Sequence, residues 1–216
     1  MYQKHVIQNV QYRNGGVGYA PETEIYQGRD HPSGVAVVSQ KGVDALTARE
    51  VGEQLGSSAR PIFTVFKNME ELQAEVRQAA MERFESRVAR REPGIPLFKQ
   101  VGIQMVTFGL QEPKLYQLLF MQEHGEAATF DDVFGQLGET AERCIDAICQ
   151  DYGLDAQDAR TLFENVWIYT FGIGALCATR VCRFSPEQLG QMLTTEFQAM
   201  LLLVRSGKLR HKEEDR

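Results

Sequence analysis

Residues 42–72 read GVDALTAREVGEQLGSSARPIFTVFKNMEEL, a pattern that predicts two short helices joined by a tight turn and followed at once by a longer helix. Thr47 and Glu50 have the spacing of a capping box, in which the hydroxyl accepts a hydrogen bond from an early N–H and the carboxylate reaches back to the cap. Gly56 stands where a left-handed residue ends a helix. Short helix, glycine turn and short helix together form the plan of a helix-turn-helix.

The second and third helices of this stretch also have recognisable first turns. We expect Ser57 or Ser58 to cap the second helix, with Pro61 in its first turn, where a missing N–H costs little. Asn68 and Glu71 then cap the third helix. The apolar residues are expected to be buried, as a hydrophobic staple of Leu46 and Val51 and as a core of Ile62, Phe63 and Phe66.

Helical periods continue on both sides of the stretch. Pro32 opens a helix over residues 32–41. Residues 1–31 show no strong period, so we expect a mobile N-terminal arm there, with a hairpin around residues 14–16 as the alternative. Residues 68–91 repeat apolar side chains at three-four spacing, and their arginines are expected on a solvated face: Arg77, Arg83, Arg87, Arg90 and Arg91.

Residues 92–96, Glu-Pro-Gly-Ile-Pro, are the clearest break in the chain, and we place a domain boundary there. The helical patterns that follow cover residues 97–108, 115–120, 133–148, 155–180 and 185–204. We expect Gly153 to end the third of them and Asp155 to cap the fourth. The last of them opens with a second capping box, Ser185 with Gln188.

The sequence therefore predicts an all-α chain of about nine helices. A helix-turn-helix domain of three small helices, with a long connecting helix, occupies residues 32–91. A C-terminal helical domain for regulation and dimerisation occupies residues 92–207, and residues 208–216 form a charged tail.

The composition is that of an ordinary soluble globular protein, with 43% hydrophobic residues and a mean hydropathy of −0.31. No apolar run reaches the length that spans a membrane and no secretory signal opens the chain, so we expect a cytoplasmic protein without a membrane partner. The net charge of −6 divides into +1 over residues 1–91 and −7 over residues 92–216. A near-neutral first part permits DNA binding without predicting it.

Motifs of enzymatic or metal chemistry are not found. There is no Gly-x-Ser-x-Gly elbow and no P-loop, and Gly172-Ile-Gly174 lies in a helical pattern rather than after a strand. The histidines at positions 5, 31, 124 and 211 are scattered. The cysteines, expected to be reduced, form two pairs five residues apart that do not share a helix face, Cys144 with Cys149 and Cys177 with Cys182. We therefore expect no enzyme activity, no cofactor and no metal.

One motif comprises residues 46–58, LTAREVGEQLGSS, followed by Ile62-Phe63, Phe66 and Glu71-Leu72. In this motif the chain resembles the tetracycline-repressor (TetR/AcrR) family of bacterial transcriptional regulators. The likeness is most specific over residues 32–72. Residues 167–172, WIYTFG, are similar to the Trp…His-Gly stretch of the subgroup with a WHG-type C-terminal domain.

The resemblance implies three partners: double-stranded operator DNA, a small-molecule effector and a second copy of the chain. The dimer is expected through a four-helix bundle made by the last two long helices of each subunit. The residues support this independently, because the helix over residues 162–180 is apolar on more than one face and carries small residues that allow close helix approach: Gly172, Gly174, Ala175 and Ala178.

Three positions depart from the family pattern. Phe63 stands where a tyrosine commonly donates its hydroxyl to a DNA phosphate, Val65 where histidine or tyrosine is frequent, and Met69 where a lysine usually opens the next helix. Pro32 also shortens the first helix. We expect weaker nonspecific DNA binding, or compensation from the N-terminal arm.

A recognition helix enters the major groove with its first residues toward the base edges. Here those residues are Ser58, Ala59, Arg60 and Thr64. Only Arg60 can make the bidentate contact with guanine; its alternative is a surface ion pair with Glu53 or Glu70. Phosphate contacts are expected from four further residues, Thr47, Arg49, Ser57 and Lys67, of which Thr47 has the alternative of acting only as a cap.

The implied effector pocket lies among the C-terminal helices, and we expect an apolar, aromatic or planar ligand. His124 and Tyr169 are candidates for its polar contacts. The candidate lining residues, each with plain core as the alternative, are Phe98, Met105, Phe108, Phe120, Phe134, Trp167 and Phe171.

Two functions are consistent with the sequence. The first is a ligand-responsive dimeric repressor that is released from operator DNA by a small apolar effector. The alternative is an all-helical dimeric ligand-binding or interaction protein whose helix-turn-helix has lost its affinity for DNA.

Overall fold

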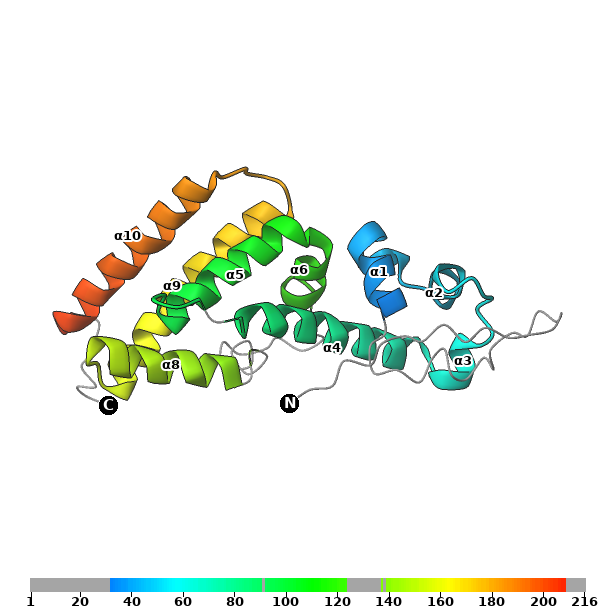
Figure 1. The fold of residues 1–216 in the computed structure, drawn as a ribbon, viewed down its shortest axis with the longest axis horizontal. Helices are drawn as coiled ribbons and strands as arrows, with labels where there is room; N and C mark the ends of the chain where they lie inside the picture. The colour runs from blue at the N-terminus through cyan, green and yellow to red at the C-terminus, as the bar shows by residue number, and fades with distance from the viewer. Residues whose placement is uncertain (1–31, 91, 124–136, 138, 209–216) are drawn as a thin grey trace, which may run out of the picture.

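The computed structural model describes residues 32–90, 92–123, 137 and 139–208, and every regular element in these ranges is helical. At one end of the elongated molecule lie α1 (Pro32–Lys41), the short 3₁₀ helix η1 (Val43–Ala45), α2 (Ala48–Gln54) and α3 (Ile62–Val65) (Figure 1). The valines of α1 at positions 35, 37 and 38 are buried. This end is the predicted helix-turn-helix.

Helix α4 (Met69–Val88) runs from this end toward the centre of the molecule (Figure 1). Its buried side chains repeat at helical spacing, as predicted: Leu72, Val76, Ala80, Phe84 and Val88. Near its start Val76 packs against α1, where a Cβ on Gly34 would lie 2.4 Å from the Val76 side chain. Near its other end Phe84 meets Phe108 edge-on, with ring centroids 5.4 Å apart.

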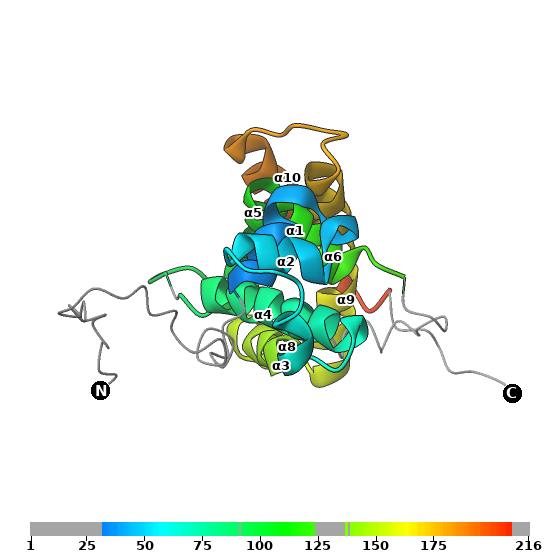
Figure 2. The same ribbon diagram turned by 90° about the vertical axis from the view of Figure 1, so that its right-hand side faces the viewer.

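The remaining helices are α5 (Leu97–Gln111), α6 (Pro113–Phe120), α8 (Glu139–Tyr152), α9 (Ala156–Ala178) and α10 (Pro186–Arg205). Helices α5 and α9 cross closely at Gly109 and Gly174. A Cβ on Gly109 would lie 2.8 Å from the backbone oxygen of Gly174. Helices α8 and α10 pack on α9. In the end-on view α10 lies at the opposite edge of the molecule from α8 (Figure 2).

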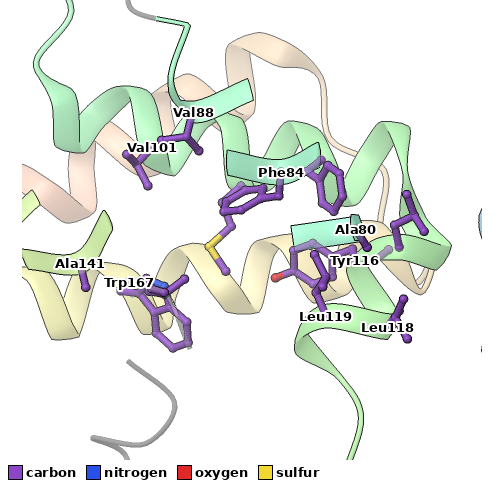
Figure 3. Close-up of a cluster of buried hydrophobic side chains, with 14 of the residues drawn as sticks. Ala80, Phe84, Val88, Val101, Tyr116, Leu118, Leu119, Ala141 and Trp167 are labelled. Carbon is purple, nitrogen blue, oxygen red and sulfur yellow. The ribbon is translucent and has the colours of Figure 1, made fainter. Parts of the chain in front are cut away.

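One core of buried side chains continues from α1 to α10. Figure 3 shows part of it, with Phe84 of α4, Tyr116 of α6 and Trp167 of α9 among the side chains drawn. Tyr116 is fully buried and its hydroxyl donates to the Phe171 carbonyl at 3.0 Å. The predicted break at residues 92–96 is a loop between α4 and α5, while the division into two domains stays a prediction.

The caps that the sequence predicts are mostly present. Asn68, Asp155 and Ser185 each accept a hydrogen bond from an N–H of the turn that follows. The Ser185–Gln188 capping box is complete in both directions. At Thr47 only half of the predicted box forms: its hydroxyl accepts from Glu50 N–H at 3.2 Å.

Four expectations about local structure are wrong. The Glu50 carboxylate pairs with Lys41 of α1 instead of returning to Thr47. Helix α3 begins only after Pro61 and has no side-chain cap, so neither Ser57 nor Ser58 caps it. Phe63 is 52% exposed rather than buried, because a helix of four residues turns few side chains inward. The arginine face of α4 is partly engaged with neighbouring helices, through Arg77, Arg83 and Arg87.

Candidate nucleic-acid interface and ligand cavity

A close backbone crossing sets the shape of the helix-turn-helix. A Cβ on Gly52 would lie 2.5 Å from the Ser58 carbonyl oxygen, so only glycine allows the turn to lie on α2. Ser57 N–H donates to the Gly52 carbonyl at 2.8 Å, and Gly56 has a φ of 69°. Residues 57–61 therefore fold back over α2 as an irregular turn and deliver α3 at the end of the molecule (Figure 1).

The residues predicted to read bases surround this turn. Ser58, Arg60 and Thr64 are exposed, and Ala59 is half-buried. Among the described residues Arg60 pairs with neither Glu53 nor Glu70, so its guanidinium extends into solvent. Thr64 is partly engaged, since its hydroxyl donates to the Pro61 carbonyl at 2.6 Å.

The residues predicted to contact phosphates are spread over the same end. Thr47 and Lys67 are exposed, and Ser57 is half-buried. Arg49 is exposed but its Nε donates to Glu53 Oε1 at 2.9 Å, and this contact raises the pKa of Arg49. An exposed pair of this kind is weak, yet it places a negative charge beside the guanidinium that Arg49 would offer to a polyanion.

Phe63 is the residue of this surface whose exposure the sequence reading missed. Its ring projects from α3 beside Thr64, while Ile62 and Phe66 fill the interior with exposures of 0% and 5%. The available signals were Pro61 and the cap at Asn68, which leave room for only a short helix between them.

A cavity of about 370 Å³ lies between α5, α9 and α10, within the size range of small-molecule sites. Of the predicted lining residues that the structure describes, Phe98 alone borders it. The other walls are mainly apolar and include Ile103 of α5, Val166 of α9 and, on α10, Leu193, Phe197 and Leu201. The Phe197 ring is tilted against the rings of Tyr152 and Phe98, with centroids 5.0 and 5.9 Å away. Lys99, Thr170 and Gln198 supply polar groups.

The other predicted lining residues lie elsewhere. Met105 and Trp167 border a neighbouring pocket of only about 20 Å³. Phe108 and Phe120 pack around Phe84, and Phe171 stacks on Trp167 at 5.3 Å. Phe134 and His124 lie outside the described residues, and Tyr169 packs beside a smaller cluster with Ile173 and Leu189.

The α10 residues of the cavity were missed by the sequence reading although a signal was present. Leu193, Phe197 and Leu201 stand four residues apart and face inward, as an amphipathic helix requires. The sequence analysis predicted that this helix packs on a partner subunit and predicted no cavity on its inner face.

The outer faces of α9 and α10 carry exposed apolar side chains. Ile168 and Leu176 of α9 expose 49% and 38%, and Leu202 and Leu203 of α10 expose 70% and 39%. A Cβ on Gly172, between them on α9, would meet no atom within 4 Å. Gly174 and Ala178, by contrast, are buried within the subunit.

Comparison with known proteins is limited to structure: no family model matches the sequence, and no curated protein matches it. A transcriptional regulator from Rhodococcus sp. Rha1 superimposes with a TM-score of 0.60 at 17% identity, over 81% of this chain and 95% of that one. A protein described as a TetR family regulator from Vibrio parahaemolyticus gives 0.52 at 14%, over 79% and 96%. The chain has the fold of TetR-family transcriptional regulators.

This fold puts the helix-turn-helix and the C-terminal helices in the order that the sequence predicted. Membership of the WHG-type subgroup stays a prediction. In the described part of the chain no helix is long and apolar enough to cross a membrane, and no three His, Cys, Asp or Glu side chains gather as they would around a metal ion. The four cysteines are free, and burial raises the pKa of the Cys177 thiol.

Proposed function

We propose that the chain is a homodimeric transcriptional regulator, a repressor that binds operator DNA through α2 and α3 and is released by a small apolar effector. The observation that carries the proposal is the turn at residues 57–61, which exposes Arg60 at the end of the molecule without an acidic partner among the described residues. Arg60 is suited to a bidentate contact with guanine in the major groove.

Effector binding is proposed in the cavity between α5, α9 and α10, whose aromatic walls suit a planar apolar molecule. The same helix α5 that borders this cavity ends beside the DNA-binding helices. Glu112, directly after α5, pairs with Arg83 of α4 and accepts a hydrogen bond from Ser39 of α1 at 3.3 Å. A shift of α5 on ligand binding would therefore displace α1 and α4 together.

Dimerisation is proposed through the outer faces of α9 and α10. Exposed Ile168, Gly172 and Leu176 recur every four residues on α9, which gives a flat apolar stripe against which a partner helix can pack. Two copies would supply the two half-sites that a helix-turn-helix regulator reads.

The alternative, an interaction protein that does not bind DNA, is favoured by the charge of this end. Residues 41–71 contain four basic and five acidic side chains, and two of the basic ones are paired, Lys41 with Glu50 and Arg49 with Glu53. Binding to DNA depends on the release of counterions by basic side chains, so a near-neutral surface weakens the nonspecific component.

The DNA-binding proposal is tested by selecting binders from a random duplex pool and by gel shift with DNA from around the protein's own gene. We expect a recovered palindromic site and an affinity that falls as salt rises. Failure to enrich any sequence, together with no salt-dependent shift, would leave the alternative.

The effector proposal is tested with a matched pair on α10. Thr194 borders the cavity, whereas its neighbour Thr195 is exposed and does not. Native mass spectrometry should find a co-purified small molecule in the wild type and in Thr195→Trp, and lose it in Thr194→Trp, where the indole fills the cavity. Retention in Thr194→Trp would place the effector elsewhere.

A further inference from the structure

The half-exposed Phe63 lies outside the buried core of the described residues. Phenylalanine is normally buried, yet this ring is 52% exposed, while Ile62 and Phe66 complete the small core beneath α3. An aromatic side chain left in solvent on a functional surface points to a partner that covers it.

The neighbours of Phe63 indicate the charge of that partner. Arg60 stands three residues before it and Lys67 four residues after it, and both side chains are exposed. Within the described ranges neither side chain has an ion pair. A ring flanked by two unpaired cations suits a polyanion that also offers an apolar contact.

Other exposed apolar side chains lie in different surroundings. Ile168, Leu176, Leu202 and Leu203 share the faces of α9 and α10 with one another, far from α3 (Figure 1). Phe63 is instead continuous with the proposed DNA-binding surface, beside Thr64 and Arg60. DNA is therefore the occupant that its position favours.

The chemistry of the major groove identifies the contacted group. Base edges there present hydrogen-bond donors and acceptors and a single apolar group, the C5-methyl of thymine. The Phe63 side chain has no atom that can donate a hydrogen bond to a phosphate. We propose that the Phe63 ring packs on a thymine methyl and so specifies thymine at one position of each half-site, next to the base that Arg60 reads.

This inference rests on the proposed DNA-binding function and adds a specificity determinant to it. Each methyl removed from such a contact should weaken binding about fourfold, from the transfer free energy of one buried carbon. Two symmetric half-sites would make the combined loss on the order of 15-fold, because contributions from separate positions are roughly additive.

The test uses the full chain and the duplex recovered by selection from a random pool. Each thymine is replaced in turn by deoxyuridine, which removes only the methyl group and leaves base pairing intact. Dissociation constants are measured for the wild type, Phe63→Ala and Val181→Ala. Val181, 70% exposed in the turn after α9, is the matched control for loss of an exposed apolar side chain.

We expect one thymine per half-site at which deoxyuridine weakens the wild type and Val181→Ala but leaves Phe63→Ala unchanged. Phe63→Ala should bind the thymine duplex about as weakly as the wild type binds a duplex with deoxyuridine at that position in both half-sites. Its thermal midpoint without DNA should lie close to that of the wild type, since Phe63 is 52% exposed and lies outside the buried core.

Two results would overturn the inference while leaving DNA binding intact. One is a wild type that is insensitive to deoxyuridine at every position. The other is a Phe63→Ala protein that retains the deoxyuridine effect or has a lowered thermal midpoint, which would mean that the ring packs on sugar or on this chain's own residues. If no duplex is selected at all, the proposed function itself fails and the inference falls with it.

Discussion

The two ends of the molecule use apolar side chains in opposite ways. At the far end α5, α6 and α9 interlock, because a Cβ on Gly174 would lie 2.4 Å from the buried Tyr116 hydroxyl. There Phe84 of α4 also meets Phe108 and Phe120 in T-shaped contacts. At the helix-turn-helix end the buried side chains are mainly aliphatic, and α3 leaves Phe63 half-exposed. The contrast teaches that one end encloses its aromatic side chains, whereas the other leaves one at the surface.

Helix α4 packs against helices of both ends, and Arg77 joins it to α6 of the far end. Its two terminal nitrogens donate to the carbonyls of Leu118 and Leu119 at 2.8 and 2.9 Å, where α6 ends. Burial lowers the pKa of this guanidinium. The bonds satisfy carbonyls that the end of a helix leaves without partners.

The largest expected effect follows from removing these two hydrogen bonds of Arg77. Arg77→Met keeps much of the stem but removes both charged hydrogen bonds, so the free energy of unfolding should fall by about 2–4 kcal/mol. Arg90→Met, on an exposed arginine of the same segment, should change it by less than about 0.5 kcal/mol. Equal effects in urea denaturation would show that α4 is not held by Arg77.

The two glycines of α9 sharpen the comparison within one helix. Gly174→Ala forces a methyl onto Tyr116 and should destabilise the protein by about 1–3 kcal/mol. Gly172→Ala meets open space in the subunit, and removing a helical glycine should stabilise it by roughly 0.5–1 kcal/mol. Thermal unfolding of each variant checks this, and a destabilised Gly172→Ala would instead report a packed dimer interface at that position.

The smallest expected effect comes from the two predicted capping boxes, of which only the one at Ser185 is complete. Glu50→Ala breaks an exposed ion pair with Lys41, whereas Gln188→Ala breaks a neutral hydrogen bond to the Ser185 N–H. Each should cost about 0.5 kcal/mol in low salt. In 1 M salt, where the Debye length is about 3 Å, the cost of Glu50→Ala should nearly vanish and that of Gln188→Ala should persist. An equal salt response in the two variants would contradict the assigned contacts.

Local signals made much of this fold predictable. The stops at Gly56 and Gly153 and the caps at Asn68, Asp155 and Ser185 depend on neighbours in sequence, and each was correctly placed. These rules act within a single turn of helix. They therefore need no knowledge of what packs against the helix.

Features that join distant parts of the chain were not predictable in the same way. Gln100 of α5 is buried and donates to the Val88 carbonyl at 3.0 Å, which ties α4 to the loop after it, and no periodicity distinguishes it from a surface glutamine. The cavity likewise depends on how α10 lies on α5 and α9. Among the predicted lining residues, only helix packing separates Phe98 from Phe108.

The central claim, that α2 and α3 read DNA, is tested most directly by anisotropy titration of the selected duplex at two salt concentrations, roughly 50 and 200 mM. Wild type and the remote exposed-arginine control Arg183→Ala should bind alike and weaken as salt rises. Arg60→Ala should bind about 5- to 150-fold more weakly and lose discrimination at one guanine position. Arg60→Ala binding that equals the wild type in affinity and specificity would contradict the account.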